Sequence, residues 1–202
     1  MKLQPVTLTG RLVRLEPLSE SHIPDLTVAA RDESIWRYMR YGTVTNQEQM
    51  RAWIHYLFDE SARGTDLPFT VIHLESNRAI GATRYLNIDP PNLALEIGGT
   101  WYAVAYQGTD VNTECKYLLL RHAFETLGCI RVQFKTDARN LRSQRAIERL
   151  GAVKEGVLRK HMLLPDGFIR DSVFYSILDT EWPTVKAKLA TRLGYHPPST
   201  KP

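Results

Sequence analysis

Cysteine is scarce in this chain of 202 residues, which also lacks long apolar runs and an excess of charge of one sign. Its two cysteines, Cys115 and Cys129, have neither the spacing of a metal site nor that of a disulfide framework. No two of the six histidines have ligand spacing along one helix face, so we expect no metal. No apolar run approaches the roughly 20 residues that span a bilayer, and the N-terminus lacks the apolar segment of a signal peptide. We therefore expect a cytoplasmic, reduced protein without a membrane partner.

The charge balance also argues against nucleic acid as a partner. The chain carries 26 Lys and Arg against 22 Asp and Glu, a net charge of +4, and the two signs are interspersed along it. This mild basicity is compatible with an anionic ligand but provides no basic face for nucleic acid. A hydrophobic content of 43% over 202 residues can fill the core of one large domain.

The apolar pattern alternates between strand and helix periods along the chain. The expected strands are residues 11–16, 67–73, 80–86, 93–102, 130–135, 157–164 and 168–178. The expected helices are residues 19–31, a helix that begins at the capping box 45–48 and stops near Gly64, residues 113–127, and a helix from Asn140 to Gly151. This order predicts an α/β fold with a mixed, mostly antiparallel central sheet flanked by helices. One right-handed parallel β-α-β crossover would run from residue 93 to residue 135.

One stretch combines a carboxylate, a polar turn and a helix start. The expected strand at 93–102 carries Glu96 and leads into Gln107-Gly108-Thr109-Asp110-Val111-Asn112-Thr113. A helix that begins there presents free backbone N–H groups, which suit a phosphate-bearing ligand. Glu96 could take a proton from a substrate held beside that ligand. The adjacent Gly98 and Gly99 predict a β-bulge or a close approach by a ligand.

These residues resemble a known family. The strand end Trp101-Tyr102, the turn Gln107-Gly108, Asn140-x-x-Ser143 and the segment Leu150-Gly151-Ala152-x-x-Glu155-Gly156-x-Leu158-Arg159 are similar to the GNAT N-acetyltransferase superfamily. Within it they resemble the RimJ/RimL branch, which acetylates protein N-termini or small amines. The likeness covers about residues 8–182 as a single domain, and residues 183–202 would form a C-terminal extension and loose tail.

The resemblance implies acetyl-CoA as co-substrate, with its pantetheine arm in a splay between the strands 93–102 and 130–135. The cofactor-binding residues implied are Trp101, Tyr102, Gln107, Gly108, Thr109, Asp110, Val111, Asn112, Thr113 and Asn140. Arg139 and Arg142 could reach the CoA phosphates or lie in solvent. The family's turn usually reads Gln/Arg-x-x-Gly-x-Gly/Ala, and this chain departs from it because Asp110 and Asn112 occupy the small positions. The Asp110 carboxylate would repel a pyrophosphate unless it points outward or meets a cation.

Two side chains are candidates for the chemistry. Glu96 is the candidate general base, or else a strand carboxylate that pairs with a neighbouring Arg or Lys. Ser143 is the candidate acid, or else a hydroxyl that bonds the backbone of its own helix. A thiol with a pKa of about 8.5 leaves readily as thiolate, so a weak donor or a water would suffice.

The acceptor amine would bind under the connection between the first two helices. Trp36, Met39 and Tyr41 are the candidate acceptor-binding residues there, although aromatic residues in such a place are also typical of a core. The predicted activity is transfer of an acetyl group from acetyl-CoA to a primary amine, by direct attack in a ternary complex. A non-catalytic CoA-binding or regulatory module, suggested by Asp110 and Asn112, is the alternative. The acceptor's identity is open, and a homodimer is compatible with the sequence.

Overall fold

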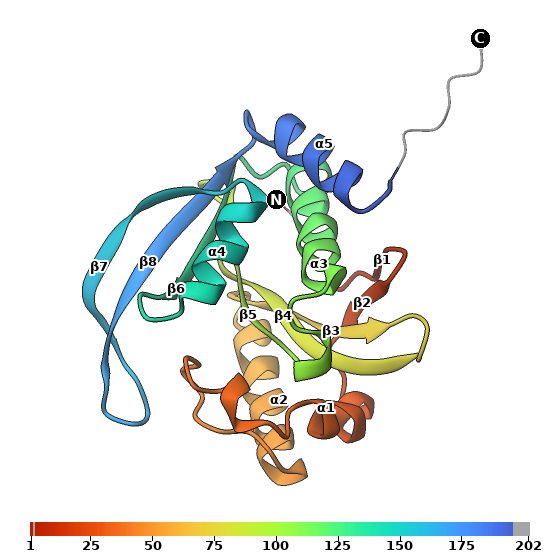
Figure 1. The fold of residues 1–202 in the computed structure, drawn as a ribbon, viewed down its shortest axis with the longest axis vertical. Helices are drawn as coiled ribbons and strands as arrows, with labels where there is room; N and C mark the ends of the chain where they lie inside the picture. The colour runs from red at the N-terminus through yellow and green to blue at the C-terminus, as the bar shows by residue number, and fades with distance from the viewer. Residues whose placement is uncertain (2, 196–202) are drawn as a thin grey trace.

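A single eight-stranded sheet forms the centre of the molecule (Figure 1), in the order β1-β2-β3-β4-β5-β6-β8-β7. The computed structural model describes residue 1 and residues 3–195. The strands are β1 (Leu8–Thr9), β2 (Val13–Pro17), β3 (Leu67–His73), β4 (Arg78–Asp89), β5 (Ala94–Tyr102), β6 (Arg131–Asp137), β7 (Val153–Leu163) and β8 (Ile169–Leu178). Every neighbouring pair is antiparallel except β5 and β6, which are parallel. The expected mixed, mostly antiparallel sheet with one parallel crossover is confirmed.

Helices cover both faces of this sheet and divide the apolar interior in two. They are α1 (Ile23–Ala29), α2 (Gln47–Ala62), α3 (Asp110–Arg121), α4 (Leu141–Leu150) and α5 (Trp182–Arg192). The smaller core lies between the sheet and the pair α1 and α2. The larger core joins the other face to α3, α4 and α5. Within residue 1 and residues 3–195, no helix is long and apolar enough to cross a membrane.

The β5–β6 pairing ends halfway along the strands, which opens the sheet. The two strands are paired only between residues 94–96 and 131–133, although β5 continues to Tyr102 and β6 to Asp137. Opposite β4, β5 contains a bulge, because the register shifts and Gly99 has φ +57°. A Cβ at position 99 would lie 2.9 Å from the Nε of Arg84, so both the backbone angle and the space require glycine. The expected bulge and splay are therefore present.

The largest correction concerns the start of α3, which we expected at Thr113. The helix begins at Asp110, three residues earlier, because the Thr109 side chain caps it by accepting from the N–H of Val111 at 3.3 Å. It ends at Arg121 and continues as a π-turn over His122–Thr126. Residues 110–112 therefore belong to the first turn of the helix and not to the loop before it.

Other boundaries differ by smaller amounts. The expected helix at 19–31 is a 3-10 turn, Glu20–His22, followed by α1. The capping box of α2 uses Asn46 with Gln49, one residue later than expected. We assigned no element to the start of the expected C-terminal extension, which forms α5 with Val185 and Leu189 buried in the larger core. The expected loose tail, at 196–202, lies outside the described residues, and the proposed domain limits stay a prediction.

A buried carboxylate on α3 ties together the two ends of the described chain. Glu114 accepts hydrogen bonds from the backbone N–H groups of residues 11–13 at 2.7–2.9 Å. The hydroxyl of Tyr195, beyond α5, donates to the same carboxylate at 2.6 Å. A Cβ on Gly10 would lie 2.5 Å from this carboxylate, so only glycine fits beside it. Helix α3 is thereby fixed between the first strands and the end of α5.

Candidate functional site

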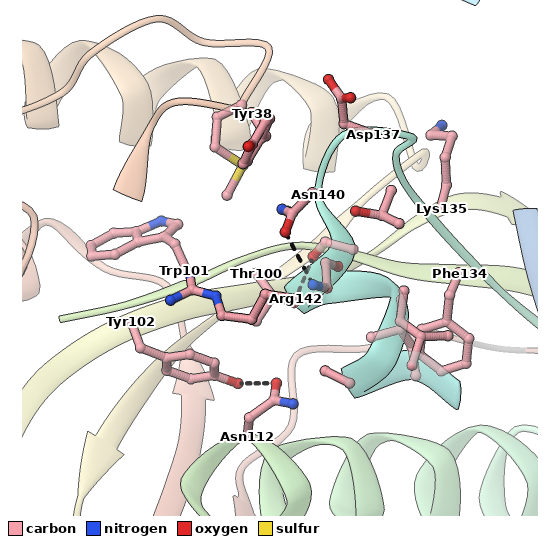
Figure 2. Close-up of a pocket in the computed structure, with 18 of the residues that line it drawn as sticks. Tyr38, Thr100, Trp101, Tyr102, Asn112, Phe134, Lys135, Asp137, Asn140 and Arg142 are labelled. Atoms are coloured by element: carbon pink, nitrogen blue, oxygen red, sulfur yellow. Dashed lines mark hydrogen bonds between the residues drawn. The ribbon is translucent and has the colours of Figure 1, made fainter. Parts of the chain in front are cut away.

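One cavity of about 530 Å³ extends from the splay of β5 and β6 to the starts of α3 and α4, under the segment between α1 and α2. Most residues singled out from the sequence line it, and Figure 2 shows several of them around the opening. Those that line it are Met39, Tyr41, Glu96, Trp101, Tyr102, Gln107, Gly108, Thr109, Asn112, Thr113, Asn140 and Ser143. Three of the predicted residues are outside its lining, namely Trp36, Asp110 and Val111. The fold thus brings together segments that are far apart in the sequence.

The turn before α3 is held by side chains at both ends. Gln107 donates from Nε2 to the carbonyl of Tyr102 at 3.0 Å and accepts from Arg142 of α4 at 2.5 Å. The Tyr102 hydroxyl donates to Asn112 at 3.2 Å (Figure 2). Gln107, which we expected to contact the pyrophosphate, therefore joins the end of β5 to the start of α4. It also places the Arg142 guanidinium beside the helix start, where an anion would be attracted.

Asp110, the departure from the family's usual turn, meets a cation. Its Oδ1 accepts from Nη2 of Arg192 in α5 at 2.9 Å and from Nε at 3.1 Å. Arg192 itself lines the cavity, whereas Asp110 does not. Because the Asp110 carboxylate is paired with Arg192, it repels a phosphate at this turn less strongly than an unpaired carboxylate would. Val111, the next residue, is buried in the larger core.

Glu96 lies at the point where β5 and β6 separate, and its side chain is almost fully buried. Its Oε2 accepts from Asn87 and Gln133, both at 3.0 Å, and lies 3.4 Å from the Nζ of Lys135. All of these contacts are made by one oxygen. The other, Oε1, faces Gly98, where a Cβ would lie only 3.2 Å away. Glu96 therefore pairs with a lysine, as one interpretation of the sequence expected. Its other oxygen lies beside the bulge, where the general base of the other interpretation would be needed.

Asn140 and Ser143 occupy the first turn of α4, across the splay from β5. Asn140, labelled in Figure 2, is the N-cap. Its Oδ1 accepts from the N–H of Ser143 at 3.0 Å. Asn140 therefore acts as a cap while lining the cavity. The hydroxyl-bearing side chain of Ser143 belongs to the same lining.

The segment between α1 and α2 covers the opposite end of the cavity. Met39 and Tyr41 line it, and the Tyr41 hydroxyl accepts a hydrogen bond from the buried Arg84. Trp36 instead packs in the smaller core, where its ring centroid lies 5.2 Å from that of Trp101 and 6.5 Å from that of Trp53. Trp36 is therefore a core residue, which was the alternative to an acceptor-binding role, and it supports Trp101, which lines the cavity.

Sequence reasoning missed a buried lysine on α3. The Nζ of Lys116 donates to Thr100 at 2.5 Å and to Thr83 at 3.3 Å, and the side chain lines the cavity beneath the β5 bulge. Burial lowers the pKa of Lys116 to about 8, because the charged form is costly in a poorly solvated site. Its neighbours on α3 are buried on all sides, so no amphipathic pattern marks this lysine in the sequence.

Sequence reasoning also missed Asp137 and Arg170, which lie where β6 ends beside β8. Asp137 is fully buried, which alone would raise its pKa, but side-chain and backbone hydrogen bonds from Arg139 outweigh this effect and lower the pKa. Arg139 also stacks on the ring of Phe168. Arg170 of β8, also in the cavity lining, donates from Nε to Ser172 at 2.9 Å. The alternation of the strands places these polar residues on one face, but the sequence alone does not show that this face lines a cavity.

Comparison with known proteins gives the same family. The family model described as "Acetyltransferase (GNAT) domain" matches residues 12–153. YdaF of Bacillus subtilis, named "Putative ribosomal N-acetyltransferase", is 34% identical over 96 residues. That match covers 48% of this chain and only 51% of YdaF, so the chain spans about half the length of this relative.

Solved structures of acetyltransferases resemble this chain over nearly its whole length. A "putative acetyltransferase" from T. thermophilus is 42% identical, with a TM-score of 0.87 over 96% of this chain and 100% of that chain. A GCN5-related N-acetyltransferase from Brucella melitensis is 30% identical, with a TM-score of 0.88 over 96% of this chain and 87% of that chain. The resemblance drawn from the sequence is confirmed. The chain belongs to the GNAT family of acetyltransferases.

Proposed function

We propose that this chain transfers an acetyl group from acetyl-CoA to a primary amine, either a protein N-terminus or a small-molecule amine, by direct attack in a ternary complex. The observation that carries the proposal is the position of Glu96. Its Oε1 lies beside the bulge at the mouth of the splay, in the same cavity as the first turn of α3 and the residues Asn140 and Ser143. The name of YdaF suggests a ribosomal protein as one acceptor.

The residues around the cavity fit a CoA-type ligand. The first turn of α3 offers backbone N–H groups, and Arg142 adds positive charge beside it, while Arg192 offsets the charge of Asp110. Between β5 and β6, the unpaired backbone beyond Glu96 is free to bond the amides of a pantetheine arm. Gly108 has φ +79°, and no atom lies within 4 Å of the place where a Cβ would be, so the turn is left open.

Bound acetyl-CoA would supply an acyl carbon with a good leaving group, a thiolate. Glu96 accepts a proton from the ammonium form of the acceptor, directly or through a water, so that the nitrogen lone pair can form the new C–N bond. Backbone N–H groups near the bulge, between Gly98 and Trp101, stabilise the negative charge that develops on the carbonyl oxygen. As the C–S bond breaks, Ser143 or a water donates a proton to the departing sulfur.

The first test separates catalysis from binding. We expect Glu96→Gln to lower kcat about 100-fold, which is within the usual contribution of a positioned base, while the Kd for CoA changes less than about threefold. Thiol release over a panel of amines measures the first quantity, and isothermal titration with CoA the second. Glu48→Gln, on the exposed face of α2, is the matched control and should leave both unchanged.

The outcomes are distinct. Equal losses of turnover and CoA affinity in Glu96→Gln would reject the assignment of the base. If CoA binds but no acceptor gives thiol release, the chain is a non-catalytic CoA-binding module. Failure to bind CoA would contradict both functions.

A further inference from the structure

Arg170 is a buried cation with no carboxylate within ion-pair distance among the described residues. Its side chain lines the cavity, and the residue is only 7% exposed. The guanidinium donates to the Oγ of Ser172 at 2.9 Å and to the carbonyl oxygen of Tyr38 at 3.4 Å. These two bonds use two of the five N–H donors of an arginine. A buried arginine normally has an anionic partner, because the unpaired charge is costly to bury.

The acidic side chains around this end of the cavity are engaged with other cations. Asp137 accepts two side-chain hydrogen bonds from Arg139, at 2.8 and 3.1 Å. Glu96 is paired with Lys135 at 3.4 Å.

The buried Arg84 is likewise neutralised, by Asp66 at 2.8 Å. Among the described residues, Arg170 is therefore the buried arginine of the cavity lining that has no carboxylate at ion-pair distance. The Arg170 guanidinium therefore favours a ligand that carries an anionic group at this end of the cavity.

The position of Arg170 restricts where that anionic group can be on an acceptor. Arg170 bonds Ser172, the β8 neighbour of Asp137, whereas Glu96 contacts Gln133 and Lys135 on β6. Along β6, Asp137 is two residues from Lys135 and four from Gln133, which corresponds to roughly 7–13 Å at ~3.3 Å per residue. The amine and carboxylate of a free α-amino acid are only about 3–4 Å apart. In an extended peptide, each further residue adds about 3.3–3.6 Å, so a side-chain carboxylate on the second or third residue reaches this span.

We propose that Arg170 is an acceptor-binding residue that holds the carboxylate of an acidic side chain at the second or third position of a peptide N-terminus. This inference rests on the proposed function, because it places the peptide's terminal amine beside Glu96. A carboxylate suits the planar guanidinium, which can bind both of its oxygens at once. Tyr38, whose carbonyl accepts from Arg170, belongs to the segment that covers this end of the cavity.

The test compares peptides that differ in one group. Serine-initiated, C-terminally amidated peptides carry Glu or Gln at position 2 or at position 3, and free glutamate and glutamine form a second arm. For at least one position we expect kcat/KM to be about tenfold or more higher for the Glu peptide than for its Gln counterpart. In Arg170→Met this ratio should fall to within about twofold, and in Arg170→Lys to an intermediate value. The ratio within each variant cancels any general loss of active protein.

The controls distinguish this inference from the proposed function. Arg159→Met, on exposed β7 of the same hairpin, should keep the wild-type ratio. A wild-type ratio near one, an unchanged ratio in Arg170→Met, or a preference confined to free glutamate overturns the proposal. If no acceptor releases thiol, the proposed function fails, but titration of the Glu and Gln peptides into the CoA-loaded protein still measures the subsite. Tighter binding of the Glu peptide that is lost in Arg170→Met supports it, and equal binding overturns it.

Discussion

At the scale of single residues, Lys116 is a lysine in the buried interior, where this residue type is rarely found. Its ammonium group is held by Thr83 and Thr100, beneath the bulge that Gly99 allows. The two threonine hydroxyls also lie 2.8 Å from each other. Lys116 therefore places a positive charge under the bulge whose backbone N–H groups we assign to the carbonyl oxygen.

The lowered pKa of Lys116 predicts a pH dependence of stability. Between the folded-state pKa of about 8 and the ordinary lysine pKa of 10.5, the unfolded chain binds more protons, so the free energy of unfolding rises with pH. At about 1.36 kcal/mol per pKa unit, the rise contributed by Lys116 is on the order of 2–3 kcal/mol. We expect Lys116→Met to lack this contribution, as measured by urea unfolding at about pH 7.5 and pH 10. Lys188→Met on exposed α5 is the control, and parallel pH profiles for wild type and Lys116→Met would contradict the prediction.

Single residues also show where sequence reasoning was limited. Glu96 could be found because alternation within a strand and two following glycines marked its position, but its pairing with Lys135 depends on which strand lies beside β5. Lys116 and Arg170 gave no signal, since one lies in a helix that is buried all round and the other near a hairpin end. Their roles depend on contacts between residues that are distant in the sequence.

At the scale of elements, α4 combines a structural cap with a wall of the site. Asn140 caps the helix through the N–H of Ser143, and Gly151 ends it with φ +102°. Both ends were predicted from the sequence, because caps and stops depend on local residue types. The start of α3 was misplaced because the threonine cap at residue 109 is followed by Asp110, Val111 and Asn112, which we assigned to a loop on the basis of the family's turn.

The two asparagine caps at the starts of α2 and α4 allow a matched test. Asn140→Ala and Asn46→Ala each remove one cap and should lower stability by about 1 kcal/mol, or roughly 2–4 °C in Tm for a chain of this size. Asn46 starts α2 on the exposed surface and is outside the cavity lining, whereas Asn140 lines it. We therefore expect only Asn140→Ala to weaken CoA binding as well, by about fivefold or more. Thermal unfolding and CoA titration measure the two effects, and equal CoA affinities in both variants would restrict Asn140 to a capping role.

At the scale of the whole molecule, Glu114 connects the first strands, α3 and the end of the described chain. Its two oxygens accept three backbone N–H groups and the Tyr195 hydroxyl, so this carboxylate acts as a common acceptor for both ends. Thr113, immediately before it, lines the cavity. The first turn of α3 is therefore held in place by the first strands and by the chain that follows α5.

Removing this acceptor should be costly. Glu114→Gln replaces one acceptor oxygen with an N–H donor and leaves buried backbone N–H groups without partners, so we expect a loss of about 3 kcal/mol. Tyr195→Phe removes a single hydrogen bond and should cost about 1 kcal/mol. Chemical denaturation of the two variants measures both values. A loss in Glu114→Gln no larger than that in Tyr195→Phe would show that the backbone bonds contribute little.

The short β5–β6 pairing has a mechanical consequence. Five strands lie on one side of it and three on the other, and among the described residues the backbone pairing that joins the two blocks is confined to residues 93–96 and 130–133. A molecule bound in the opening would touch both blocks at once and restrain their relative rotation, and its release would restore that freedom. Ligand occupancy and the rigidity of the entire sheet would then rise and fall together.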